Sequence, residues 1–172
     1  MTHFPRILTE NFVLEYFVME TMEIFTDGGS RGNPGPSACA FTVLIDNKVV
    51  YQFAKKLGIA TNNIAEYHGI IEALKYLRQN PEILSNFTKI NFFADSLLIV
   101  NQLNGKFKIK NKNLQDLVFK AKHLEKEITT KICYNEIKIV YNAVSRPLNK
   151  ITDALINKIL DNFHEDFIEK IF

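Results

Sequence analysis

The chain turns at Asp27-Gly-Gly-Ser-Arg-Gly-Asn-Pro-Gly-Pro36, where four glycines and two prolines fall within ten residues. Apolar residues precede this stretch from Met22 and follow it from Ala38 to Ile45. Because glycine and proline at this density favour tight turns and apolar runs favour strands, the pattern predicts a strand, a turn and a second strand. Asp27 then lies where the first strand ends. Asp-Gly is also ordinary turn chemistry, so the aspartate becomes informative only beside other acidic residues.

The composition is typical of one globular domain. A chain of 172 residues, 47% hydrophobic and 23% charged, is large enough for one core and is neither disordered nor membrane-spanning. The net charge of +2 gives no general basicity, so nucleic-acid binding has to depend on where the lysines lie. Cys39 and Cys133 lack metal-binding spacing and are typical of free thiols in a reducing compartment, with a disulfide as the alternative.

The first twenty residues differ in character from the rest. They contain no basic leader, no long apolar core and no small-residue cleavage site, so we do not expect secretion. We interpret residues 1–20 as an N-terminal extension of unknown role and residues 21–172 as the domain, including its C-terminal helix. The expected protein is a cytoplasmic monomer that does not engage a membrane.

Hydrophobic periodicity predicts an α/β fold with a mixed sheet. Three strands come first and are antiparallel, with Asp46-Asn47 as a hairpin turn. Two further strands follow through helical crossovers and should be parallel. The last helix opens near Asn149, and its helical spacing continues to Ile171. The expected strands are about 22–27, 38–46, 48–56, 89–94 and 136–141, and the other expected helices are about 63–79, 97–103 and 113–128.

Acidic residues recur at the positions where such a sheet binds ligands. Asp95 ends a strand as Asp27 does, and ligands of α/β sheets collect at the carboxyl ends of the strands. Glu66 continues an apolar row of the helix at 63–79, where a carboxylate needs a cation or a donor, unless it turns outward at the edge of that row. Glu72 lies on the side of the same helix that we interpret as solvated. Asp153 lies in the first turns of the last helix.

Four carboxylates gathered in one cleft have a definite chemistry. Their mutual repulsion requires either protonation or a bound cation. Ligation by oxygen alone, without Cys or His, selects Mg²⁺ or Mn²⁺ over Zn²⁺. Two such ions about 4 Å apart activate a water molecule and stabilise the leaving oxygen in phosphodiester hydrolysis. The four candidates are Asp27, Glu66, Asp95 and Asp153.

These acids belong to four motifs that resemble, in order, those of the ribonuclease H type 1 family. The resemblance covers about residues 22–160 and is greatest to the compact branch of the family, which lacks a large basic protrusion. Each motif is weak alone, and the four together are specific. They are Asp27 to Pro36; Thr61-Asn-Asn-Ile-Ala-Glu66-Tyr; Ala94-Asp95-Ser96 with Val100-Asn101-Gln102; and Arg146-Pro-Leu-Asn149-Lys-Ile-Thr-Asp153.

The resemblance implies a fold and an activity. The fold is the three-layer ribonuclease H-like α/β fold, with a mixed five-stranded sheet of three antiparallel and then two parallel strands and helices on both faces. The activity is cleavage of the RNA strand of an RNA–DNA hybrid, which leaves 5′-phosphate and 3′-hydroxyl ends. The implied cofactor is two Mg²⁺ ions, with Mn²⁺ as an alternative, and the implied ligands are the four carboxylates.

The resemblance also implies substrate contacts. Asn33, Asn62 and Asn63 correspond to residues that touch the hybrid backbone and the 2′-hydroxyls, and Thr61 to part of a DNA-phosphate pocket. Amides can both donate to and accept from a 2′-hydroxyl, the group that distinguishes RNA from DNA. The run from Lys106 to Lys112 contains no acidic residue. It could bind phosphates without sequence preference, or it could be a solvated edge. Its lysines are Lys106, Lys108, Lys110 and Lys112.

Two departures from the family bear on the substrate and on turnover. Residues 142–149 contain no histidine, which many relatives carry before the last aspartate, and Arg146 is the candidate for an electrostatic role there. Leu97 follows Asp95-Ser96 where some relatives carry a polar residue. Two other functions stay open: a ribonuclease H-like module that binds without cleaving, and a nuclease of the same fold that acts on another duplex.

Overall fold

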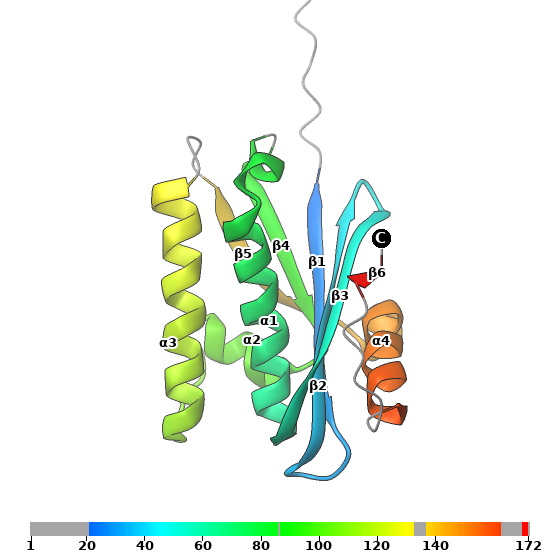
Figure 1. Cartoon of the computed structure of the whole chain (residues 1–172). Coiled ribbons are helices and arrows are strands. Elements are labelled where there is room, and N and C mark those ends of the chain that lie inside the picture. Colours follow the sequence, from blue (N-terminus) through cyan, green and yellow to red (C-terminus); the bar gives the residue numbers. More distant parts are fainter. Residues whose placement is uncertain (1–20, 86, 133–136, 163–169, 172) are drawn as a thin grey trace, which may run out of the picture.

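The structure, a computed structural model, describes residues 21–85, 87–132, 137–162 and 170–171 (Figure 1). The predicted extension, residues 1–20, lies outside the described residues, as does Cys133. Cys39 is a buried free thiol. Among the described residues, no helix combines the length and the apolar character that crossing a bilayer requires.

The sheet is mixed, as predicted. β1 (Met22–Ser30), β2 (Gly35–Ile45) and β3 (Lys48–Ala60) are antiparallel neighbours. β4 (Lys89–Ala94) is parallel to β1, and β5 (Lys138–Ala143) is parallel to β4. A short strand, β6 (Lys170–Ile171), adds to β3, so the order is β5-β4-β1-β2-β3-β6. The five predicted strands are confirmed, and β6 is an addition to them.

The β2–β3 hairpin turns at Asp46-Asn47, as predicted. Both residues have positive φ, 49° and 61°, which is the backbone conformation that tight hairpins require and that Asp and Asn tolerate. The turn also holds the chain that enters β1, because Thr21 and Asp46 exchange two hydrogen bonds of 3.4 Å.

Helices cover both faces of the sheet, which makes three layers (Figure 1). α1 (Asn62–Gln79), α2 (Leu97–Leu103) and α3 (Lys112–Glu127) lie on one face over the main core, and α4 (Lys150–Asp161) covers the other. Short helical turns follow α1, α3 and β5. They span Pro81–Leu84, Ile128–Ile132 and Arg146–Asn149.

The C-terminal helix is shorter than its spacing predicted. α4 ends at Asp161, whereas Ile171 belongs to β6, so the expectation of helix as far as Ile171 is wrong. The expected helical residues 163–169 lie outside the described residues. The physical reason is that β3 offers unpaired backbone groups along its outer edge, and Ile171 pairs with Gln52 there.

Glu72 is not on a solvated face, and that interpretation was wrong. Its side chain is 11% exposed, and Oε1 accepts from Lys55 Nζ at 2.8 Å and from Lys75 Nζ at 2.7 Å. The carboxylate is buried because this side of α1 faces β3, which carries Lys55. The two ammonium groups outweigh the effect of burial and lower the pKa of Glu72.

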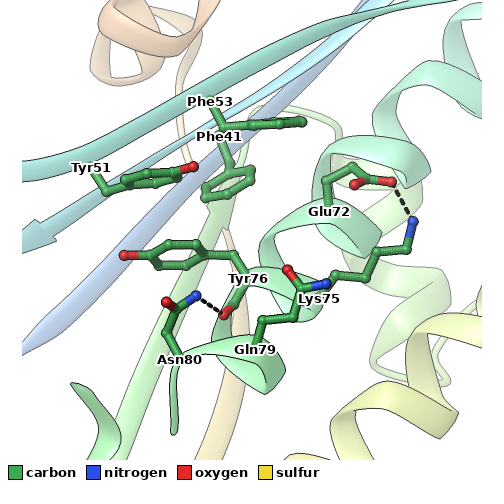
Figure 2. Close-up of a pocket in the computed structure, with 8 residues that line it drawn as sticks. All are labelled: Phe41, Tyr51, Phe53, Glu72, Lys75, Tyr76, Gln79 and Asn80. Atoms are coloured by element: carbon green, nitrogen blue, oxygen red, sulfur yellow. Dashed lines mark hydrogen bonds and ion pairs between the residues drawn. The ribbon is translucent and has the colours of Figure 1, made fainter. Parts of the chain in front are cut away.

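Beside Glu72 lies an aromatic pocket between the sheet and the last turns of α1 (Figure 2). The rings of Tyr51 and Tyr76 stack at 4.2 Å between centroids. Phe41 and Phe53 continue the same cluster along the sheet, with their ring centroids 5.3 Å apart. Tyr76, in this pocket, lies ten residues after Glu66, about 15 Å along α1 at the helical rise per residue, and none of the four candidate carboxylates lines the pocket.

Candidate active site

Two aspartates lie at one edge of the sheet because their strands are parallel neighbours. Phe25 of β1 pairs with Phe93 of β4, and Asp27 and Asp95 each lie two residues further on. Asp27 is still within β1 and is only 9% exposed, whereas Asp95 follows directly after β4. The shared register therefore brings both side chains to the carboxyl edge of the sheet.

Two glycines bring Glu66 to the same place. A Cβ at Gly28 would lie 2.1 Å from the carbonyl carbon of Ala65, and a Cβ at Gly69 would lie 2.5 Å from the carbonyl oxygen of Asp27. α1 therefore crosses β1 in direct backbone contact, which no side chain at either position would permit. Because of this close packing, the second turn of α1 carries Glu66 to the end of β1.

The fourth acid, Asp153, comes from α4 on the other face. The Nδ2 of buried Asn149 donates to the carbonyl oxygen of Thr26 at 3.0 Å and so ties the beginning of α4 to β1. Two turns further, Ile156 packs close to Gly29, where an added Cβ would lie 3.1 Å from its Cγ2. These contacts place the first turn of α4 beside the residue that follows Thr26, which is Asp27.

The four carboxylates line one open cavity of about 190 Å³. They come from β1, α1, the end of β4 and α4, which are far apart in the sequence. Five hydrogen-bonding side chains line the cavity with them. These are Ser30, Arg31, Asn62, Arg146 and Asn157.

Burial and repulsion raise the pKa of Asp27 to about 7. Burial is the largest cause, and the negative charge of Asp95 adds to it, followed by the charges of Asp153 and Glu66. The backbone N–H of Gly28 donates to Oδ1 at 2.7 Å and opposes the rise. At neutral pH the metal-free cavity therefore holds protons that a bound cation would displace.

Glu66 carries the one unsatisfied carboxylate oxygen among the buried side-chain atoms that the structure describes. Its Oε1 accepts from the Nδ2 of Asn62 at 2.9 Å, but Oε2 is buried without a hydrogen-bond partner. Burial raises the pKa of Glu66 to about 7, and Asp95 adds to the rise, whereas the side chains of Ser96 and Asn62 oppose it. A buried oxygen without a donor is costly unless a cation meets it.

Asp153 is held by two donors. The Nη2 of Arg146 donates to Oδ1 at 2.9 Å, and the Nδ2 of Asn157 donates to Oδ2 at 2.9 Å. Within the described part of the chain, no three acidic, histidine or cysteine side chains form a ready-made metal cage. The donor set nevertheless fits a hard divalent cation, because it consists of carboxylate oxygens and includes the orphaned Oε2 of Glu66.

Comparison with known proteins decides the family. The family model of RNase H matches residues 19–157, which is most of the chain. The chain belongs to the ribonuclease H family.

Individual ribonucleases H are similar in sequence and in fold. The bifunctional protein Rv2228c of Mycobacterium tuberculosis is 34% identical over 140 residues, which are 80% of this chain and 35% of the relative. Ribonuclease HI of Halobacterium salinarum is 32% identical over 139 residues, which are 80% of this chain and 63% of the relative. The chain thus spans about a third of the first curated relative and less than two thirds of the second.

A solved structure gives the same fold. The structure of LC11-RNase H1, isolated from compost by a metagenomic approach, matches with a TM-score of 0.76 and 30% identity, covering 86% of this chain and 100% of that one. The same protein in complex with an RNA/DNA hybrid matches with a TM-score of 0.74. These type 1 proteins confirm the predicted type 1 resemblance and the predicted fold. Residues 104–111, between α2 and α3, contain no helix, as expected for the compact branch.

In this ribonuclease H chain, the predicted substrate residues fall into two groups. Asn62 lines the cavity, and its backbone N–H donates to Oδ1 of Asn33 at 3.2 Å, so these two residues lie together beside the acids. Thr61 caps α1, where its hydroxyl accepts from the N–H of Ile64, and Asn63 is the second residue of that helix. These four residues, unlike the basic run, lie at the end of α1 that carries Glu66.

The basic run of the ribonuclease H chain lies outside the acidic cavity. It forms the connection from α2 to the first residue of α3. Phe107, within the run, is 47% exposed. All four lysines, Lys106, Lys108, Lys110 and Lys112, are exposed to solvent.

Sequence reasoning did not name three polar residues of the ribonuclease H cavity, which are Ser30, Arg31 and Asn157. Asn157 follows Asp153 by four residues on α4, a spacing at which helical side chains meet, so this signal was available. Arg31 was part of the first motif, but its contact with Asn157 joins positions 126 residues apart, and no local pattern predicts such a contact.

Proposed function

We propose that this chain hydrolyses the RNA strand of RNA–DNA hybrids by a two-metal-ion mechanism, leaving 5′-phosphate and 3′-hydroxyl ends. The observation that carries the proposal is the convergence of Asp27, Glu66, Asp95 and Asp153 on one cavity, with a buried carboxylate oxygen left unpaired. Membership of the ribonuclease H family supports the same activity.

The four carboxylates would hold two Mg²⁺ ions, and Mn²⁺ could replace them. Carboxylate oxygens are the ligands that both ions prefer. When bound, the ions supply Lewis-acid activation of water and stabilisation of the leaving oxygen. Metal binding displaces protons from Asp27 and Glu66, whose pKa values are raised to about 7.

The chain's own residues hold these carboxylates in place for that chemistry. Asn62 donates to Glu66 and favours its ionised form. Arg146 and Asn157 each donate to one oxygen of Asp153 and fix its side chain. Because Arg146 is 76% exposed, its guanidinium also presents a positive charge at the mouth of the cavity, where a phosphate would approach.

The substrate proposed is an RNA–DNA hybrid. Asn33 and Asn62 lie beside the acids and carry amides, which can bind a 2′-hydroxyl as donor and acceptor. We assign Thr61 and Asn63 to the neighbouring backbone contacts on the same end of α1. The exposed lysines between α2 and α3 would contact phosphates further along the duplex. The match to LC11-RNase H1, solved with an RNA/DNA hybrid, supports this substrate class.

The remaining assignments concern the whole protein. We propose a cytoplasmic monomer, and the free thiol of Cys39 in the core is consistent with a reducing compartment. The assignment of residues 1–20 to an extension and residues 21–172 to the domain stays a prediction.

A panel of duplexes of one sequence tests the proposed activity. Hybrid, double-stranded RNA and double-stranded DNA, each end-labelled on either strand, are incubated with the protein in Mg²⁺. We expect cleavage of the RNA strand of the hybrid alone, with products that a phosphatase and a 3′-extending polymerase identify as 5′-phosphate and 3′-hydroxyl. Cleavage of another duplex would replace the substrate assignment, and binding without cleavage would make the protein a binding module.

A further inference from the structure

Three polar side chains form a ladder along one face of α4. Asp153, Asn157 and Asp161 are spaced by four residues, so they follow each other on the same side of the helix. An arginine from a separate loop binds each end of the ladder. Arg146 donates to Asp153, and Arg31 donates to Asp161 at 2.6 Å.

The amide of Asn157 joins the two halves of this ladder. Its Nδ2 donates to Oδ2 of Asp153 at 2.9 Å and to the carbonyl oxygen of the same residue at 3.1 Å. Its Oδ1 accepts from Nη2 of Arg31 at 3.2 Å. Reversing the amide would bring its oxygen against the carboxylate of Asp153 and its NH₂ group against the guanidinium of Arg31. Both new contacts would be repulsive, so Arg31 selects the orientation in which Asn157 donates to Asp153.

Arg31 is itself fixed by the turn that follows β1. Its backbone N–H donates to the carbonyl oxygen of Pro36 at 2.8 Å. A Cβ at Gly35 would lie 2.1 Å from the carbonyl oxygen of Arg31, so the turn is closed tightly around this residue. The turn therefore holds the backbone from which the Arg31 side chain reaches α4.

We propose that Asn157 is a positioning residue for the carboxylate of Asp153 and that Arg31 acts through it by fixing the amide orientation. This inference rests on the proposed function, in which Asp153 is a metal ligand. An ionised carboxylate has about four lone-pair sites, and the donors Arg146 and Asn157 occupy two of them. The remaining sites are free to meet a cation, while the side chain cannot rotate away.

Four proteins form a double-mutant cycle that tests whether Arg31 acts through Asn157. The proteins are wild type, Asn157→Ala, Arg31→Ala and the double variant, and Arg78→Ala is the matched control. Arg78 is also a surface arginine paired with one carboxylate, Glu127, at 3.3 Å. It lies near the C-terminal end of α1, away from the end that carries Glu66. The first readout is the dissociation constant for Mn²⁺ without substrate, from the electron paramagnetic resonance signal of free Mn²⁺. The second is the thermal unfolding temperature.

Asn157→Ala should weaken Mn²⁺ binding about tenfold, the usual size of an outer-shell effect on metal affinity. Arg31→Ala should weaken it less, Arg31→Lys should restore part of the loss, and the double variant should match Asn157→Ala alone. Arg78→Ala should bind Mn²⁺ as wild type does. Because Asn157 is half-buried and Arg31 exposed, these variants should remain folded, and Asn157→Ser provides a second substitution.

Three results would overturn the inference. Unchanged Mn²⁺ affinity with a lowered unfolding temperature would make the ladder merely structural, and additive losses in the double variant would mean that Arg31 acts independently of Asn157. Absence of Mn²⁺ binding by wild type would remove both the inference and the proposed function. The four proteins could show the expected Mn²⁺ affinities while wild type does not cleave the hybrid. That result would reject the proposed function and leave the positioning role of Asn157 in place.

Discussion

Asn62 and Glu66 are joined by a hydrogen bond of 2.9 Å between Nδ2 of the amide and Oε1 of the carboxylate, one turn apart on α1. The bond satisfies one oxygen of Glu66 and leaves Oε2 unpaired in a buried position. Glu66 is thus oriented by a neighbour of its own helix, with its free oxygen kept for another partner.

Removing the amide should shift the pH dependence of cleavage. In Asn62→Ala the ionised form of Glu66 loses a donor, so its pKa should rise above the value of about 7 in the intact site. We expect the pH of half-maximal kcat at low Mg²⁺ to rise by about one unit, equivalent to about 1.4 kcal/mol. Asn80→Ala, at the other end of α1, is the control. An unchanged profile would show that the bond does not tune Glu66.

Gly28→Ala should destabilise the fold more than Gly29→Ala does. The added Cβ at Gly28 would meet backbone atoms of α1 at 2.1 Å, so strand and helix would have to separate. At Gly29 it would meet side-chain atoms alone, the Cγ2 of Ile156 at 3.1 Å and the Cδ1 of Leu160 at 3.5 Å, and these side chains can shift. Urea unfolding should show a loss of about 3 kcal/mol for Gly28→Ala and less than about 1 kcal/mol for Gly29→Ala. Equal losses would contradict the close crossing of α1 over β1.

Stability of the metal-free protein should depend on pH through Asp27. Its pKa is raised from 3.8 to about 7, so the neutral form is favoured in the folded state. The contribution of neutral Asp27 to the free energy of unfolding is complete below about pH 4 and is lost as the pH rises through 7. Between pH 5 and 8 the unfolding temperature of wild type should therefore fall relative to that of Asp27→Asn. A constant difference over this range would contradict the raised pKa.

Mg²⁺ should reverse that loss and bind more tightly at higher pH. Binding displaces protons from Asp27 and Glu66, so the rise in unfolding temperature caused by saturating Mg²⁺ should be larger at pH 8 than at pH 6. Calorimetry in two buffers of different ionisation enthalpy measures the protons released. A stabilisation independent of pH would place the ion away from these two carboxylates.

The basic run should contribute salt-dependent affinity for the hybrid. With Lys106, Lys108, Lys110 and Lys112 replaced by alanine, the slope of log affinity against log salt should become shallower, by about one unit per lost phosphate contact. Lys89 and Lys138 are exposed at the amino ends of β4 and β5 and serve as the control pair. An unchanged slope would make the run a solvated edge, the alternative that its composition allows.

Local sequence pattern was enough to place three of the acids. Asp27 and Asp95 follow apolar runs that form parallel strands, and parallel strands end at one edge of the sheet. Glu66 continues an apolar row of its helix, and the close contact of that helix with β1 brings it inward. Asp153 was a candidate because of its place in the first turns of the last helix, but no local pattern shows that α4 packs across the opposite face of the sheet and brings it beside Asp27.

The incorrect predictions for Glu72 and Ile171 also arise from contacts between distant segments of the chain. Glu72 was interpreted as solvated because helical periodicity cannot show that Lys55, on a neighbouring strand, would cover that side of α1. Ile171 continued a helical spacing, but periodicity contains no information about the open edge of β3 with which it pairs. Arg31 and Asn157 meet only in the folded chain. Contacts between distant segments are thus what the sequence left open.

Cleavage of an end-labelled RNA–DNA hybrid in Mg²⁺ by wild type and by Asp27→Asn, with hybrid binding measured in parallel, tests the central claim most directly. The account predicts that wild type cuts the RNA strand and that the variant is at least about a thousandfold slower, equivalent to about 4 kcal/mol in the barrier. Binding of the hybrid should be largely retained. Equal cleavage rates for the two proteins would contradict the assignment of Asp27. A wild type that binds the hybrid without cleaving it would contradict the proposed activity.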